Sequence, residues 1–146
     1  MRARDRAERE DQRLSLLWLD IDEFKQINDT EGHDTGDVAL RHVADCLREQ
    51  LRGYDLAGRW GGDEFLVMLY PSNDDRMQRV AERLRGQVAN NVDVCGQPIT
   101  VSVGGYCAEG AEPLSQILAR ADRALYWAKE MGRNRVCLHR DAGETD

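Results

Sequence analysis

Two glycines and two carboxylates lie together near the middle of the sequence, within residues 59–65 (Arg-Trp-Gly-Gly-Asp-Glu-Phe). The apolar runs 54–60 and 65–70 flank them, and paired glycines between two such runs are typical of a β-hairpin. Because glycine has no Cβ, a second molecule can approach its backbone closely. Asp63 and Glu64 at this turn indicate a bound cation, and a cation beside open backbone indicates a phosphate ester. An ordinary polar hairpin tip is the alternative.

A second pair of acids follows an apolar run. Residues 14–19 (Leu-Ser-Leu-Leu-Trp-Leu) have the length and composition of a strand that is covered on both faces, and Asp20, Ile21 and Asp22 come next. The twofold period of a strand puts the two acids on one side. A carboxylate at the end of a buried strand is costly unless it is paired or bound to a metal. Capping of the next helix explains Asp22 but not Asp20, so we expect Asp20 to be a metal ligand.

Two further polar residues have the chemistry to bind a nucleotide base. Residues 28–36 have the composition of a loop, which begins at Asn28 and is followed by Asp37. An ionised carboxylate only accepts hydrogen bonds, so Asp37 suits the N1–H and N2–H donors of guanine and not adenine. The residues alone leave a plainer alternative open, in which Asp37 is the N-cap of a helix that ends near residue 51.

Composition limits the class of protein. The 146 residues, 41% hydrophobic and 32% charged, suit one globular domain. A net charge of −7 argues against general DNA binding, and no apolar run approaches the ~20 residues of a membrane span. The cysteines lack CxxC spacing, as expected of free thiols in the cytoplasm. Of the 20 Lys and Arg residues, only Lys25 and Lys129 are lysines, which favours a need for an ammonium there, such as contact with phosphate.

The elements that position these residues follow from periodicity, in the order β-α-β-β-α-(ββ)-α-β. Strands are predicted at residues 14–19, 54–60, 65–70, 92–95, 98–106 and 135–139, and helices at 23–27, 37–51, 76–89 and 114–131. The order predicts an α+β fold, a ferredoxin-like or palm-type antiparallel sheet (a βαββαβ core plus an extra hairpin) with helices packed on one face. In that fold Asp20, Asp63 and Glu64 should meet at one point and form a magnesium site.

Several spaced motifs together resemble the GGDEF domain of the diguanylate cyclase family. They are residues 20–29 (Asp-Ile-Asp-Glu-Phe-Lys-Gln-Ile-Asn-Asp), 32–33 (Gly-His), 36–37 (Gly-Asp), 61–65 (Gly-Gly-Asp-Glu-Phe), and Lys129 with 132–134 (Gly-Arg-Asn). The resemblance implies an enzyme that joins two GTP molecules into cyclic di-GMP and releases pyrophosphate, with Mg²⁺ (or Mn²⁺) as cofactor. Since one domain holds one GTP, it also implies catalysis by a homodimer.

The resemblance also implies roles for individual residues. Asp20, the backbone carbonyl of Ile21, and Asp63 would hold the metal, and Glu64 would assist the metal or the attacking 3′-hydroxyl. The implied GTP-binding residues are Asn28 and Asp37 at the guanine, Gly61 and Gly62 along the phosphates, Lys129, Arg133 and Lys25 at the terminal phosphates, and Phe24.

Residues 52–55 (Arg-Gly-Tyr-Asp) are similar to the inhibitory product site of the family, which has the form RxxD. An arginine fork pairs with guanine O6 and N7 or with phosphate, and an aspartate pairs with the N–H edge of guanine. Arg52 and Asp55, together with Arg83 from the following helix, are therefore expected to bind cyclic di-GMP.

The sequence departs from the family at its start. GGDEF domains usually begin with an Asp-x-Leu-Thr-Gly-Leu-x-Asn-Arg segment, whereas residues 1–13 are charged and predict a helical stalk. Residues 14–139 would form the domain and 140–146 a disordered tail. We expect a sensor or regulatory domain in a longer parent chain. The alternatives are a module that senses GTP or cyclic di-GMP without cyclising, and a polymerase-like or adenylate-cyclase-like enzyme of the palm fold.

Overall fold

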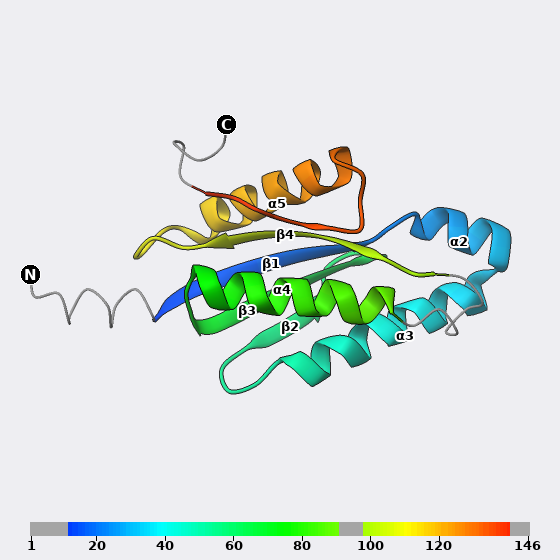
Figure 1. Cartoon of the computed structure of the whole chain (residues 1–146), viewed down its shortest axis with the longest axis horizontal. Helices are drawn as coiled ribbons and strands as arrows, with labels where there is room; N and C mark the ends of the chain where they lie inside the picture. Colours follow the sequence, from blue (N-terminus) through cyan, green and yellow to red (C-terminus); the bar gives the residue numbers. More distant parts are fainter. Residues whose placement is uncertain (1–11, 91–97, 141–146) are drawn as a thin grey trace, which may run out of the picture.

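The computed structural model describes residues 12–90 and 98–140, in which five strands form one sheet flanked by four helices (Figure 1). The elements are β1 (Arg13–Ile21), α2 (Phe24–Glu31), α3 (His33–Gln50), β2 (Leu56–Arg59), β3 (Glu64–Ser72), α4 (Asp74–Ala89), β4 (Val101–Cys107), α5 (Leu114–Glu130) and β5 (Val136–Leu138). The predicted α+β class is confirmed, and so is the order of the elements that lie in the described residues. The predicted strand at residues 92–95 lies outside the described residues.

The sheet has the order β2-β3-β1-β4-β5, with β1 at its centre. β1 is antiparallel to both β3 and β4, and β2 is antiparallel to β3. β5 is parallel to β4 because α5 crosses over between them. The sheet is therefore mixed, and the prediction of a wholly antiparallel sheet holds for four of its strands.

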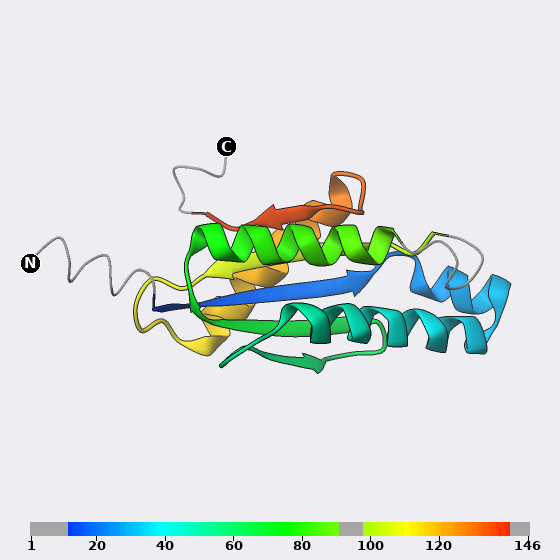
Figure 2. The same ribbon diagram turned by 60° about the horizontal axis from the view of Figure 1, so that its bottom comes forward.

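Helices cover both faces of the sheet, so the prediction of helices on one face was wrong. Leu17 and Leu19 of β1 belong to the larger core, which also holds buried residues of α3 and α4. Leu16 faces the other way and packs in a second core with Ile117 and Ala121 of α5. Figure 2 shows α3 and α4 on one side of the sheet and α5 on the other. A strand that is apolar on both faces needs cover on both.

The connection between α2 and α3 is much shorter than predicted. Residues 28–36 were expected to be a loop, yet α2 extends to Glu31 and α3 begins at His33, so that only Gly32 (φ 93°) separates them. The side-chain oxygen of Asn28 lies only 1.8 Å from the position that a Cβ on Gly36 would take, so a larger residue would not fit there without a shift. The absence of a Cβ on Gly36 therefore lets Asn28 of α2 pack against the backbone of α3. Asp37 therefore lies within α3 and is not its N-cap, because Gly32 holds that position.

Candidate functional site

The central hairpin lies beside the end of β1, as the strand order predicts. Asp20 is paired in register with Glu64, and the Ile21 N–H donates to the Asp63 carbonyl at 3.0 Å. The Arg59 guanidinium donates to the carbonyls of Gly61 (3.1 Å) and Gly62 (2.7 Å) and so holds the turn closed. The turn that carries the two glycines is thus fixed against the strand that carries Asp20.

Asp20 is a buried acid with an incomplete set of partners. Asp20 is 8% exposed. Its Oδ2 pairs with Lys129 Nζ, and its Oδ1 is buried without a hydrogen-bond partner. Burial raises the pKa of the Asp20 carboxyl to about 7; Lys129 opposes this rise and the nearby Asp63 carboxylate adds to it. An added cation would supply the partner that Oδ1 lacks and would offset the repulsion between the two acids.

Glu64 does not join the two aspartates. Its Oε1 accepts a hydrogen bond from the Trp18 indole Nε1 at 2.8 Å, and its Oε2 lies 3.0 Å from where a Cβ on Gly61 would be. Among the described residues there is no group of three or more His, Cys, Asp or Glu side chains that could hold a metal. The expected meeting of three carboxylates is therefore reduced to two, because the longer Glu64 side chain reaches the indole donor on β1.

The end of α5 brings two cations to the same region. Lys129, in the last turn of α5, pairs with Asp20, and Arg133 follows in the turn after the helix. The Arg133 N–H donates to the Ala128 carbonyl at 3.0 Å, which ties this turn to α5. Lys25 lies exposed on α2. The structure thus brings one of the two lysines of the chain to the buried acid.

Asp22 has a different structural role from the one expected of it. The N-cap of α2 is Glu23, which makes no side-chain capping bond. The Asp22 carboxylate instead accepts hydrogen bonds from Thr100 Oγ1 (2.7 Å), Ser102 Oγ (2.6 Å) and the Asn134 N–H (3.0 Å). Sequence reasoning missed these donors, although the Thr-Val-Ser-Val alternation at residues 100–103 indicates a strand with one polar face.

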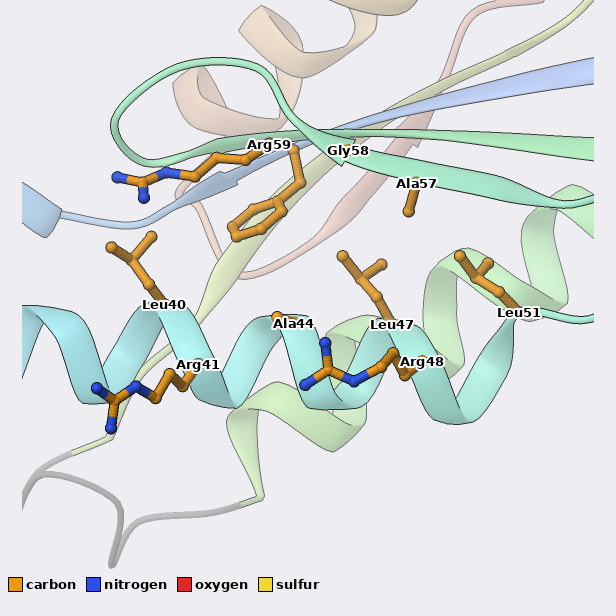
Figure 3. A pocket seen from close by; sticks show the side chains of 10 residues that line it. Leu40, Arg41, Ala44, Leu47, Arg48, Leu51, Ala57, Gly58 and Arg59 are labelled. Carbon is orange, nitrogen blue, oxygen red and sulfur yellow. The ribbon is translucent and has the colours of Figure 1, made fainter.

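A groove of about 570 Å³ lies between α3 and β2 (Figure 3). Its lining combines aliphatic side chains of α3, the backbone and small side chains of β2, and arginines at the rim: Leu40, Arg41, Ala44, Leu47, Arg48, Leu51, Ala57, Gly58, Arg59 and Phe65. Asp37 lies one helical turn before Leu40 and Arg41, so it lies on the same face of α3. Phe24 and Asn28 of α2 pack against Gly36: Phe24 Cζ and Asn28 Oδ1 lie 3.3 Å and 1.8 Å from the position that a Cβ on this glycine would take. Because Gly36 directly precedes Asp37, both residues that were predicted to contact a base lie near the start of α3, and neither belongs to the lining of the groove.

Comparison with known proteins identifies the family. The sequence profile described as "Diguanylate cyclase, GGDEF domain" matches residues 1–135. The chain belongs to the GGDEF family. Diguanylate cyclase DosC of Escherichia coli (strain K12) is 40% identical over 132 residues, which cover 86% of this chain and 28% of DosC. The chain therefore spans less than a third of the length of that relative.

Solved GGDEF-family structures share the fold. The active GGEEF domain of a diguanylate cyclase from Vibrio cholerae has a TM-score of 0.83 and 35% identity, over 96% of this chain and 91% of that one. The GGDEF domain of DgcB from Caulobacter crescentus, in complex with c-di-GMP, has a TM-score of 0.81 and 35% identity, over 93% and 84% of the two chains. The resemblance inferred from the motifs is thus confirmed.

In this GGDEF domain the RxxD motif forms a turn, and the carboxylate of its aspartate, Asp55, already accepts four hydrogen bonds from the protein. Asp55 Oδ1 accepts from the Tyr70 N–H (2.9 Å) and from Arg76 (3.1 Å). Asp55 Oδ2 accepts from the Arg52 N–H (3.1 Å) and from Arg76 (2.6 Å). The side chain is 0% exposed. These four hydrogen bonds use the acceptor positions of the carboxylate, so Asp55 can accept from guanine only by exchanging a partner.

The cleft beside this motif is rich in arginine. It has a volume of about 260 Å³, and its lining includes Arg52, Arg76, Arg79 and Arg83. Burial tends to raise the pKa of Asp55, but Arg76 and two backbone N–H donors hold it below its usual value. Sequence reasoning missed Arg76 because an arginine on the outer face of a helix is most often solvated.

Within the described ranges 12–90 and 98–140, the domain has no helix that is long and apolar enough to cross a membrane.

Proposed function

We propose that the domain is a diguanylate cyclase, which joins two GTP molecules into cyclic di-GMP and releases pyrophosphate. The observation that carries this proposal is the buried Asp20 carboxylate, which has one oxygen without a partner and lies beside Asp63 and Lys129. A site for nucleotidyl transfer needs acids for a metal and cations for the phosphates in one place. The junction of β1, the hairpin and the end of α5 supplies both.

The residues present fit a bound Mg²⁺. Magnesium is held by one or two carboxylates together with substrate phosphates, so two aspartates are sufficient. Asp20, Asp63 and the Ile21 carbonyl would hold it, with Mn²⁺ as a possible substitute. When bound, the ion lowers the pKa of the attacking 3′-hydroxyl and offsets negative charge on the pyrophosphate. Glu64 assists from its position against Trp18 by accepting the proton of that hydroxyl.

The guanine would bind at the Asp37 end of the groove between α3 and β2. Asp37 accepts from the N1–H and N2–H of guanine, and the amide of Asn28 binds the same base. Phe24 and the aliphatic lining contribute the apolar surface on which a purine packs. This arrangement selects GTP over ATP, because adenine lacks the two donors and would leave the carboxylate unpaired.

The phosphates would extend from this groove towards the end of α5. The backbone of Gly61 and Gly62 lies along them, and Lys129 and Arg133 bind the terminal phosphates. Lys129 is paired with Asp20 in this structure, so it would exchange this carboxylate for a phosphate when GTP binds. Lys25, which is exposed on α2, joins from the solvent side.

Two domains must act together, because each holds one GTP and the product contains two new phosphodiester bonds. Activity is therefore expected to rise more than linearly with protein concentration below the dissociation constant of the homodimer. A strictly linear dependence across that range would contradict the proposal. A regulatory domain that controls dimerisation is also part of it, since DosC is much longer than this domain. The GTP substrate and the unbridged cysteines among the described residues support a cytoplasmic location.

Product inhibition would take place in the arginine-lined cleft. Arg52 and Arg83 bind the phosphates or the Hoogsteen edges of cyclic di-GMP. Asp55 contributes to this site chiefly by folding the turn that carries Arg52, since its carboxylate accepts the Arg52 N–H. Replacing Arg52 by alanine is expected to weaken product inhibition and product affinity together.

The test of the cyclase proposal is incubation with GTP and Mg²⁺, followed by separation of the nucleotides. The unaltered chain is expected to form cyclic di-GMP, and Asp63→Ala is expected to form none. A matched control is Asp122→Ala, which removes one exposed carboxylate from α5 and should leave activity unchanged. GTP or cyclic di-GMP that is bound but not turned over would refute the enzyme and support a sensor module.

A further inference from the structure

The turn that carries Arg133 has an unfavourable backbone conformation. After Gly132 (φ 122°), Arg133 and Asn134 both have positive φ angles, of 63° and 47°. Residues with a Cβ are disfavoured in this left-handed region, and two in succession are kept there only when their surroundings hold them. The direction in which the Arg133 side chain leaves the backbone therefore depends on the contacts of this turn.

Those contacts come from three directions. The Arg133 N–H donates to the Ala128 carbonyl in α5. Arg85 of α4 donates to the Asn134 side-chain oxygen at 3.0 Å. The Asn134 N–H donates to Asp22 Oδ2 at 3.0 Å. Of these three acceptors, Asp22 is anionic and the oxygens of Ala128 and Asn134 are neutral, and a bond to an ionised acceptor is roughly twice as strong as a neutral one.

Asp22 is itself held firmly in place. Its backbone N–H donates to the Thr100 carbonyl at 2.9 Å, and its carboxylate accepts from the Thr100 and Ser102 hydroxyls. Ser102 is 0% exposed. These hydrogen bonds fix the position of the Asp22 carboxylate, so the Asn134 N–H must be placed to reach it. Asp22 lies two residues after Asp20, so it connects the strand end that carries the buried acid to the turn that carries Arg133.

We propose that Asp22 is a positioning residue for phosphate binding: through the Asn134 N–H it sets Arg133 at a fixed distance and direction from Asp20. The proposal rests on the function proposed above, in which Arg133 binds the terminal phosphates of GTP. Asp22 contacts neither base nor phosphate in this scheme. Its loss should therefore weaken binding only of nucleotides that carry the terminal phosphates.

Two non-reacting nucleotides test the proposal. 3′-Deoxy-GTP and 3′-deoxy-GMP lack the attacking hydroxyl, so binding can be measured by calorimetry without turnover. The unaltered domain is expected to bind the triphosphate more tightly than the monophosphate. Asp22→Ala is expected to weaken triphosphate binding about tenfold and to change monophosphate binding less than about twofold, as is Arg133→Ala. The double variant should lose no more than either single one, because both changes remove the same contact.

The controls separate positioning from folding. Asp22→Asn keeps an oxygen acceptor for the Asn134 N–H and should weaken triphosphate binding less than Asp22→Ala does, by about threefold, and Asp122→Ala should change neither constant. If Asp22→Ala does not fold, the same ratio of affinities is measured on Asp22→Asn, where a loss of about threefold for the triphosphate alone is expected. An unchanged ratio, or equal weakening of both nucleotides, overturns the proposal. If the unaltered domain does not prefer the triphosphate, the phosphate role of Arg133 fails and this proposal fails with it.

Discussion

Replacing Asp55 by alanine is expected to destabilise the domain by about 3–5 kcal/mol. The Asp55 side chain is 0% exposed and that of Arg76 is 14% exposed. The substitution leaves the Arg76 guanidinium almost buried without its carboxylate, and it leaves the Tyr70 and Arg52 N–H groups without their acceptor. Breaking one side of a buried, hydrogen-bonded ion pair costs the desolvation of the charge that remains. A loss of this size is a large share of the ~5–15 kcal/mol by which a domain is stable.

The assay is urea unfolding followed by circular dichroism at pH 7, with the free energy of unfolding obtained by linear extrapolation. The control Asp122→Ala removes an exposed carboxylate and should change stability by no more than about 0.5 kcal/mol. The double variant Asp55→Ala/Arg76→Ala should lose clearly less than the sum of the single variants, because it leaves no stranded charge. A loss below about 1 kcal/mol for Asp55→Ala would refute the reasoning and would return Asp55 to a role in direct product binding.

The same pair predicts a dependence on pH. Burial alone would raise the pKa of Asp55, but Arg76 and the backbone donors lower it below its usual value. A lowered folded-state pKa gives stability that is present above the unfolded pKa, about 4, and is lost as pH falls through the folded value. The difference in stability between the unaltered domain and Asp55→Ala should therefore shrink below about pH 4.

Three further predictions concern the base, the buried acid and the packing of α5. Asp37→Ser should reduce the preference for GTP over ATP by at least about tenfold in competition binding, because it removes an ionised acceptor for two guanine donors. The pKa of Asp20 is raised to about 7 by burial, so its contribution to stability is complete below the unfolded value of about 4 and is lost as pH rises through about 7. In metal-free urea unfolding, Asp20→Asn should therefore gain stability relative to the unaltered domain between pH 5 and pH 8. Gly104→Ala should cost at least about 2–3 kcal/mol, because its Cβ would lie 2.2 Å from Leu125 N and 2.4 Å from the Ala121 carbonyl.

Each of these predictions has an outcome that contradicts it. Unchanged base selectivity in Asp37→Ser would remove Asp37 from the guanine site. A stability difference for Asp20→Asn that does not vary with pH would mean that the acid is ionised throughout. Gly86→Ala is the matched control for Gly104→Ala, since nothing lies within 4 Å of its added Cβ, and it should stabilise α4 slightly. Equal effects of the two glycine substitutions would show that α5 does not pack directly on β4.

The sequence alone determined those features that depend on local chemistry and on the order of elements. The paired glycines between two apolar runs predicted the hairpin, and the apolar run before Asp20 predicted the central strand. Because strand order follows from the succession of elements, the neighbourhood of Asp20 and residues 61–64 could be predicted as well. The spaced motifs were sufficient to identify the family.

Only the tertiary structure decided which partner each polar side chain takes. Asp22 accepts from Asn134, 112 residues later in the chain, and Asp55 pairs with Arg76 across 21 residues. Glu64 accepts a hydrogen bond from the Trp18 indole, a partner 46 residues earlier in the chain. A carboxylate binds the donors that packing brings within about 3 Å, and packing depends on contacts between elements that lie far apart in sequence. The residue types therefore indicate what chemistry is available, and the fold decides which residues carry it out.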